Sequence, residues 1–309
     1  MADPADRLLA GVEEDWTSPA LSTSHLRPVQ PISTGIEDHG SYTVEMVGVK
    51  WRPKDNIDLY VMKPNGVAKP PVILYLYGYP SDVDRFQDAK FEKQVTGDGF
   101  AAVGFVSALD GPRYHDVALT TSFLSELQES LATSAHDVQL ILDYLEKRGD
   151  LDMTRVGMYA QGSGASIAIL ASAVDARIRV LDTIDPWGDW PDWLAGSAVV
   201  PEKERANYLT PEFLNKVATL DPVEWLPRMQ AKSFRLQDVT IEPNTPPNAK
   251  EKLRSAVPVA SGHATIQLYR TPEEVAALVR HNKSLEWIQQ ELRALDNTQT
   301  STNDQRSSK

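Results

Sequence analysis

One glycine-rich stretch, residues 155–170, carries the clearest chemical signal in the sequence. It reads as a short strand that runs through a turn straight into an apolar helix. A turn of this kind lifts a nucleophilic serine to the top of a parallel sheet, and its pattern is Gly-x-Ser-x-Gly. When the segment from Ala160 to Gly164 is aligned on the end of the strand and the start of the helix, Gly162 occupies the place of the serine. The stretch therefore indicates acyl-transfer chemistry but holds no nucleophile where one is expected.

A register shifted by one residue would make Ser163 the nucleophile. That register puts Gln161 two residues before the serine, where the tight turn requires a small residue. In the unshifted register Ser163 caps the helix, and its backbone N–H takes the position of an oxyanion donor. We favour the unshifted register and keep a catalytic Ser163 as the alternative.

The elements that position this turn follow from the pattern of apolar residues. Four apolar runs alternate with helical stretches, and they cover residues 72–77, 100–106, 156–159 and 178–184. Continuous apolarity is typical of strands covered on both faces, which predicts an α/β fold with a mostly parallel central sheet and helices on both faces. Alternation with period two over residues 42–46 and 57–61 predicts an N-terminal antiparallel hairpin.

Further helices and strands complete this prediction. A helix is expected to begin at the N-cap Ser134 and to end at Gly149. Two strands, near residues 233–239 and 264–269, precede a long amphipathic helix over residues 275–292.

The composition of successive segments predicts the domain organisation. Residues 1–40 mix charge, Ser, Thr and Pro and are expected to form an N-terminal arm on the surface. Residues 41–295 form the α/β domain, and within it the Trp- and Pro-rich residues 186–229 are expected to be a small cap insertion over the carboxyl edge of the sheet. The polar residues 296–309 are expected to be disordered.

Charge and composition exclude several classes of function. The chain of 309 residues has a formal net charge of −12, which disfavours binding to nucleic acid or to an anionic membrane. It contains no cysteine, so disulfides, thiolate metal sites and a cysteine nucleophile are excluded. No His/Asp/Glu cluster has metal-ligand spacing and no phosphate-binding loop is present, so we expect no cofactor. The acidic start lacks the features of a signal peptide, which predicts a cytoplasmic protein as written, or else a processed secreted one.

The order of these elements over residues 42–295 resembles the α/β-hydrolase superfamily, in particular its branch of acetyl xylan esterases, dienelactone hydrolases and prolyl-oligopeptidase-like proteins. Four stretches carry the resemblance: residues 70–80, 137–154, 155–170 and 239–253. The first is similar to the strand that leads to a His-Gly oxyanion turn, with Tyr77 in the place of the histidine. The resemblance implies a serine esterase or peptidase fold and a small ester, acyl or peptide-like ligand.

The resemblance also implies a histidine base after the last strand, and residues 270–275 contain none. His263 is the candidate that remains near that strand, but it precedes the strand and should lie at the opposite edge of the sheet. His115, beside Asp116, and His136 could reach the site from loops and helix starts at the carboxyl edge. For each of these histidines a surface or structural role is the competing interpretation.

The resemblance assigns the remaining parts of the site. Glu242 stands where the acid of the triad is usually an aspartate, and Asp185 at the end of its own strand competes for that role. Gly78 and Tyr79 resemble the oxyanion turn. Trp187 and the other tryptophans of the cap either pack the lid or form an apolar wall for a ligand.

These observations lead to three hypotheses. The first is a binding or non-hydrolytic protein of this fold whose triad is incomplete, because both the nucleophile and the base are missing. The second is an active carboxylesterase or peptidase that uses Ser163. The third is that Gly162 was introduced to inactivate an enzyme.

Overall fold

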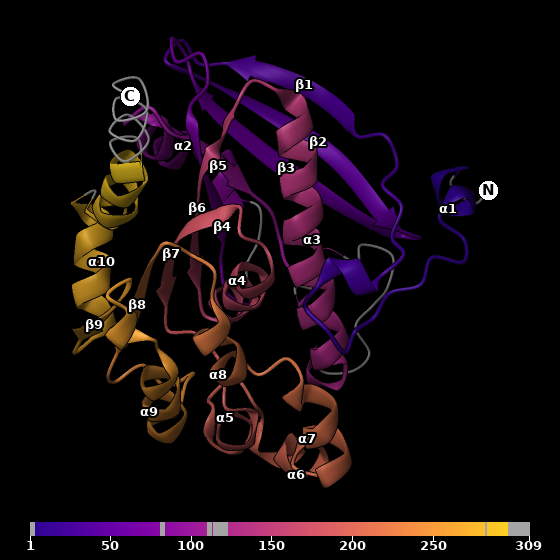
Figure 1. Cartoon of the computed structure of the whole chain (residues 1–309), viewed down its shortest axis with the longest axis vertical. Coiled ribbons are helices and arrows are strands. Elements are labelled where there is room, and N and C mark those ends of the chain that lie inside the picture. The colour runs from indigo at the N-terminus through magenta and orange to yellow at the C-terminus, as the bar shows by residue number, and fades with distance from the viewer. Residues whose placement is uncertain (1–3, 81–83, 110–112, 114–122, 282, 296–309) are drawn as a thin grey trace, which may run out of the picture.

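The centre of the protein is a mixed β-sheet, seen in the computed structural model of Figure 1, which describes residues 4–80, 84–109, 113, 123–281 and 283–295. The described part of the sheet has nine strands in the order β1-β2-β3-β5-β4-β6-β7-β8-β9. Their bounds are β1 (Ile32–Asp38), β2 (Tyr42–Arg52), β3 (Asp55–Pro64), β4 (Pro71–Leu76), β5 (Ala101–Gly104), β6 (Asp152–Gln161), β7 (Ile178–Ile184), β8 (Ser233–Val239) and β9 (Ala264–Tyr269).

The sheet is antiparallel at its start and parallel afterwards, as predicted. Strands β1, β2, β3 and β5 pair antiparallel in succession, and every pairing from β5 through β4 to β9 is parallel. The expected hairpin is β2–β3. Strand β1 was not expected, because it lies within the segment that we assigned to the arm, so the sheet begins before Tyr42.

Helices cover both faces of the sheet. Their bounds are α1 (Pro4–Leu8), α2 (Ala89–Thr96), α3 (Leu127–Arg148), α4 (Ser163–Val174), α5 (Trp190–Gly196), α6 (Arg205–Tyr208), α7 (Pro211–Ala218), α8 (Pro222–Trp225), α9 (Pro247–Ala256), α10 (Pro272–Arg280) and a helix over residues 286–295. Leu74 of β4 packs in the core that includes α3 and α4. Its neighbour Tyr75 packs in the core on the other face, with Val95 of α2 and Ile288 of the last described helix. The two cores explain why β4 is apolar without alternation.

Two of the predicted helices differ from those in the structure. Helix α3 begins at Leu127, so Ser134 lies inside it; the Ser134 hydroxyl donates to the carbonyl oxygen of Ser130 at 2.7 Å and accepts from the N–H of Ala108 at 2.9 Å. The predicted end at Gly149 was correct, since this residue has φ +74°. The long helix expected over residues 275–292 is divided into α10 and the helix over residues 286–295.

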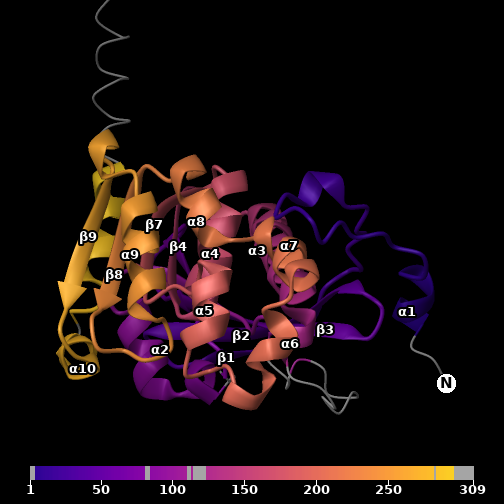
Figure 2. The same cartoon turned by 90° about the horizontal axis from the view of Figure 1, so that it is seen from below.

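The segment predicted to be a cap folds into short helices. Helices α5, α6, α7 and α8 lie together at one end of the molecule in Figure 1. Seen from that end, they lie in front of the sheet (Figure 2). The described part of the chain contains no helix with the length and hydropathy needed to cross a bilayer.

A buried ionic network fastens the N-terminal segment to the body of the protein. Arg52 of β2 donates through Nε and Nη2 to the Glu14 carboxylate at 2.5 Å each, and its Nη1 lies 2.6 Å from Asp137 Oδ1 of α3. Arg113 binds Asp55 through two nitrogens, at 2.8 and 2.7 Å, and its Nη1 lies 2.7 Å from Asp137 Oδ2. The network therefore joins the arm, two strands, α3 and Arg113.

His136, which was expected to reach the candidate site, belongs to this network instead. Its side chain is fully buried, with Nδ1 at 2.7 Å from Glu14 Oε1 and Nε2 at 3.0 Å from the Ser18 carbonyl oxygen. Burial raises the pKa of Glu14, but hydrogen bonds from Arg52 and His136 outweigh burial and lower it to about 2. The carboxylate is thus charged at neutral pH and holds the arm in place.

We expect Glu14→Gln to lower the free energy of unfolding by about 2–3 kcal/mol at pH 7, because a buried charge pair loses one partner. The depressed pKa means that the stabilisation is present above the ordinary value of 4.5 and is lost as the pH falls toward about 2. Urea denaturation should therefore show a larger difference from the wild type at pH 7 than at pH 3, where part of the stabilisation is already lost. Glu13→Gln, at an exposed neighbouring residue, is the control. A loss that is the same at both pH values would contradict this account.

Candidate functional site

The turn between β6 and α4, which we call the elbow, carries a glycine at the position predicted for a nucleophile. Gly162 has φ +55° and ψ −125°, and its N–H donates to the Ile184 carbonyl oxygen of β7 at 2.9 Å. A Cβ atom at this position would lie 3.5 Å from Gly78 Cα and 3.6 Å from Trp187 Nε1. These are ordinary van der Waals distances, so the space beside Gly162 would admit a Cβ atom, while the positive φ favours glycine.

Ser163 is the first residue of α4 and its side chain is fully buried. Its Oγ accepts a hydrogen bond from the Tyr79 backbone N–H at 2.9 Å. The expected capping role was wrong, because the side chain binds the turn after β4 instead of an N–H of its own helix. Ser163 thus fastens the elbow to the Gly78–Tyr79 turn.

The elbow and that turn are close because a glycine follows Ser163. A Cβ atom at Gly164 would lie only 2.4 Å from the Leu76 carbonyl oxygen and 2.8 Å from the Tyr77 carbonyl oxygen. Any side chain here would collide with backbone, which cannot move as a flexible side chain can. Packing therefore requires glycine at position 164, whereas at position 162 the positive φ favours it.

An aromatic wall, which we define as Tyr79, Phe123, Trp187 and Trp193, stands beside Gly162. Ring centroids are 4.3 Å apart between Tyr79 and Phe123, 6.2 Å between Phe123 and Trp187, and 4.7 Å between Trp187 and Trp193. Trp187 is 2% exposed. Its indole N–H has no hydrogen-bond acceptor within the described residues, although its carbonyl oxygen accepts from Ser166 Oγ at 2.7 Å.

Asp185 lies at the end of β7 with φ +46°. Its Oδ1 accepts from the Val239 N–H at 2.8 Å and from Lys250 Nζ at 3.2 Å. Burial raises its pKa to about 6; Lys250 and the Val239 N–H oppose the rise, and the nearby charge of Glu242 adds to it. Asp185 is therefore a carboxyl group that changes charge close to neutral pH.

Glu242 turns into its own loop. Its two carboxylate oxygens accept from the backbone N–H groups of Asn244 at 2.8 Å and Thr245 at 3.2 Å.

Lys250 of α9, which sequence reasoning missed, is 4% exposed and connects Asp185 to Asp238, with a further bond to the Val239 carbonyl oxygen. The sequence offered only its position in residues 239–253, the stretch that was assigned to the acid loop.

The described histidines lie away from these groups. His263 is exposed in the loop before β9, and its carbonyl oxygen accepts from the N–H of Phe234 near the start of β8, so it lies at the amino edge of the parallel strands. His136 belongs to the ionic network. His115 and Asp116 lie outside the described residues. Within the described ranges, no histidine forms a hydrogen bond or ion pair with Ser163, Asp185 or Glu242.

The structure therefore brings together one part of the predicted site and separates another. Gly78, Tyr79, Gly162, Ser163 and Trp187 are in contact around the elbow. Asp185 and Glu242 form a neighbouring group at the ends of β7 and β8, and His263 is apart from both. The described part of the chain holds no group of three or more side chains that could bind a metal ion.

Comparison with known proteins identifies the fold. No family model matches the chain, and no curated protein matches its sequence. Among solved structures, the acetyl xylan esterase from Paenibacillus sp. R4 is similar, with a TM-score of 0.63 and 15% identity over 85% of this chain and 90% of that chain. The acetyl xylan esterase 1 from Thermoanaerobacterium sp. JW/SL YS485 has a TM-score of 0.63 and 14% identity over 84% and 88%.

A third similar structure is a putative dienelactone hydrolase from Klebsiella pneumoniae subsp. pneumoniae MGH 78578. It has a TM-score of 0.55 and 15% identity, over 85% of this chain and 99% of that chain. These likenesses confirm the predicted α/β-hydrolase fold. Because fold does not determine activity, the function must be argued from the site.

We expect Ser163→Ala to lower the free energy of unfolding by about 1–3 kcal/mol, because the Tyr79 N–H loses its acceptor in a buried place. Ser172→Ala, at a fully buried position in the same helix, is the control: its hydroxyl makes only a 3.4 Å bond to the Ile169 carbonyl oxygen. Chemical denaturation of both variants measures the difference. A Ser163 variant as stable as the wild type would contradict a structural role for this hydroxyl.

Proposed function

We propose that this protein binds a small ester, acyl or peptide-like molecule at the elbow without hydrolysing it through a serine nucleophile. The observation that carries the proposal is the 2.9 Å hydrogen bond from the Tyr79 N–H to Ser163 Oγ. Acyl transfer needs an accessible nucleophile, a base and free donors for the oxyanion. In this bond one candidate nucleophile and one candidate oxyanion donor are both engaged with each other.

Two further features support a site without serine catalysis. Gly162, which occupies the predicted place of the nucleophile, has no side chain that could attack. Ser163 is fully buried, and within the described residues no histidine reaches its hydroxyl to accept a proton. A hydroxyl without a base is a poor nucleophile at neutral pH.

The groups left available at the elbow suit an oxygen acceptor with an apolar body. The Ser163 backbone N–H at the start of α4 has no acceptor among the described residues, and the Trp187 indole N–H, which also faces Gly162, has none either. Two donors next to each other favour a carbonyl or carboxylate oxygen. Tyr79 and Phe123, the partly exposed members of the aromatic wall, offer an apolar surface to the rest of such a ligand.

We expect a fluorophosphonate probe to leave the protein unmodified, because no activated serine is present. Intact-protein mass spectrometry after incubation measures the adduct, and a serine esterase treated in parallel shows that the probe is reactive. A stoichiometric adduct at Ser163, located by peptide mapping, would overturn the proposal and favour the active carboxylesterase or peptidase.

We expect N-acetyl-phenylalanine methyl ester to bind and to be recovered intact. Quenching of tryptophan fluorescence measures binding, and chromatography measures hydrolysis. Trp187→Phe should weaken binding roughly threefold to tenfold, because it removes the indole N–H. Trp225→Phe, which removes an indole already bonded to the Thr219 carbonyl oxygen, should leave binding unchanged. Release of N-acetyl-phenylalanine above the buffer rate would contradict the non-hydrolytic part, and equal effects of the two variants would contradict the site.

A further inference from the structure

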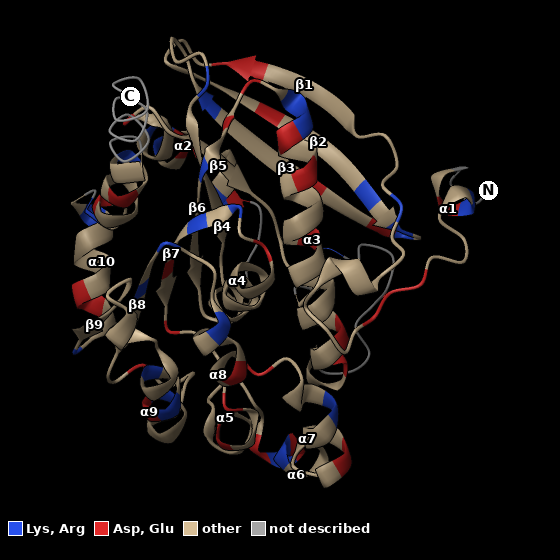
Figure 3. Ribbon diagram, viewed as in Figure 1, with Lys and Arg blue, Asp and Glu red and all other residues tan. Residues whose placement is uncertain are grey.

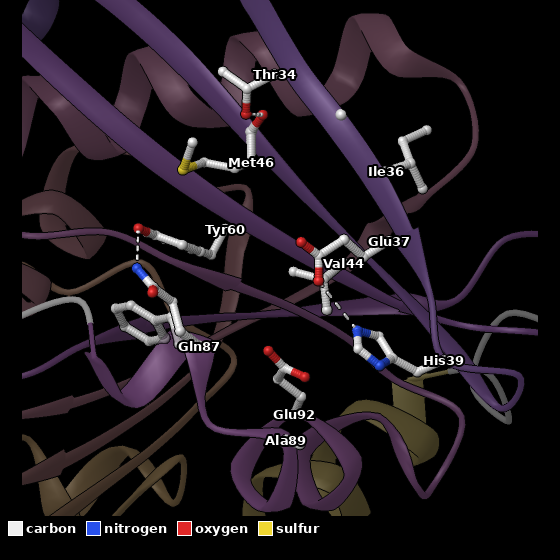
Figure 4. A pocket seen from close by; sticks show the side chains of 12 residues that line it. Thr34, Ile36, Glu37, His39, Val44, Met46, Tyr60, Gln87, Ala89 and Glu92 are labelled. Atoms are coloured by element: carbon white, nitrogen blue, oxygen red, sulfur yellow. Dashed lines mark hydrogen bonds and ion pairs between the residues drawn. The ribbon is translucent and has the colours of Figure 1, made fainter.

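A cavity of about 580 Å³ lies between the antiparallel strands and α2. Figure 4 shows it from close by, with side chains of β1, β2 and β3 on one side and those of α2 and the short helix Asp84–Gln87 on the other. Its volume is in the range of cavities that hold small organic ligands. None of the residues of the elbow lines it, so it is independent of the site proposed above.

Glu92 of α2 is the buried charged group of this cavity. The residue is 5% exposed, and Figure 4 shows its carboxylate projecting from α2 into the cavity. Its Oε2 accepts a hydrogen bond from the Tyr42 hydroxyl at 3.0 Å. Within the described residues no lysine or arginine binds Glu92, and a carboxylate can accept several more hydrogen bonds than one.

A carboxylate buried in this way is costly to keep charged without a counter-ion. The position of Glu92 in the first turn of α2 offsets part of the cost through the helix dipole. Tyr42 offers only a neutral hydroxyl, since burial, and then the bond to Glu92, raise the pKa of Tyr42 to about 12. A bound cation would supply the remaining compensation.

A second carboxylate stands at the rim. Glu37, at the acidic end of β1 seen in Figure 3, is 81% exposed, and Figure 4 shows it across the cavity from Glu92. It lies 3.6 Å from His39 Nε2, and the His39 ring stacks on Tyr42 with 4.9 Å between centroids. The described lining contains no lysine or arginine, so with His39 neutral its charge is negative.

The remaining walls are aromatic and apolar. Tyr60 and Phe86 stack with their centroids 5.7 Å apart, and Gln87 Nε2 donates to the Tyr60 hydroxyl at 3.0 Å. Met46, which pairs with Tyr60 across β2 and β3, and Val44 of β2 add apolar side chains to the lining. Aromatic faces attract cations, and the thioether of methionine adapts to apolar ligands of different shape.

We propose that this cavity binds a small organic ammonium ion, with the charged group between Glu92 and Glu37 and the apolar body against Tyr60, Phe86 and Met46. A metal ion fits less well, because the described residues here do not provide three ligand side chains. Tight binding needs both the positive charge and the apolar body of the ligand. A neutral molecule leaves Glu92 uncompensated, and a bare cation leaves the aromatic wall unused.

Calorimetric titration with 3-phenylpropylamine, and with 3-phenylpropanol as its uncharged counterpart, tests the proposal on the full chain. We expect the amine to bind at least roughly tenfold more tightly than the alcohol. Glu92→Gln keeps the acceptor for Tyr42 and removes the charge, and it should weaken amine binding roughly tenfold or more. Glu212→Gln, which removes a charge from the exposed face of α7, should leave binding unchanged.

A second variant tests the proposal independently, in case the Glu92→Gln protein does not fold. Ala89 is an exposed lining residue at the start of α2, so Ala89→Trp should fill the cavity and abolish amine binding while the thermal midpoint stays close to that of the wild type. The proposal is overturned if the wild type binds no amine, if it binds amine and alcohol equally, or if neither Glu92→Gln nor Ala89→Trp weakens binding. Because the elbow is intact in both variants, these results do not depend on the function proposed there.

Discussion

The contact between the start of α4 and the turn after β4 determines the arrangement of the carboxyl edge. It is possible only because Gly164 presents no side chain to the carbonyl oxygens of Leu76 and Tyr77. The same closeness that would bring a nucleophile and an oxyanion donor together in an acyl-transfer site here lets the Ser163 hydroxyl satisfy the Tyr79 N–H. The close approach of the elbow to the Gly78–Tyr79 turn and the hydrogen bond between them thus have one cause.

Buried hydrogen bonds order the segment over residues 186–229 internally, and one of them attaches it to α4. Asp221 accepts from the backbone N–H groups of Asp189 and Trp190 at 2.8 and 2.9 Å, and from Val223 at 3.0 Å. The Ser166 hydroxyl of α4 donates to the Trp187 carbonyl oxygen at 2.7 Å. The backbone of Trp187 is therefore held by α4, and that of Asp189 and Trp190 by Asp221.

The apolar pattern predicted the parallel sheet and the elbow, because buried strands and an apolar helix leave continuous signals. It did not predict β1, all seven residues of which are exposed, so no period distinguishes this strand from a loop. The start of α3 was missed because Ser134 looks like a cap in sequence, while in the fold its hydroxyl bonds back to Ser130.

The charged interior was beyond sequence reasoning for a different reason. Arg52 and Asp137 are far apart in the chain and of a type usually found at the surface. Only the fold brings them within 2.6 Å of each other. Lys250 escaped notice in the same way, since its partners Asp185 and Asp238 end two different strands.

The ionic network has a consequence for where a self-sufficient folding unit begins. Composition suggests a boundary near residue 41, but the carboxylate of Glu14 binds Arg52 and His136 in the body of the protein. Three carboxylates, two guanidinium groups and one imidazole share this interior space, and removing the arm would leave Arg52 buried with fewer counter-charges than it has now. A fragment trimmed at the compositional boundary would therefore lack part of the charge balance of this interior, so the folding unit includes the segment that carries Glu14.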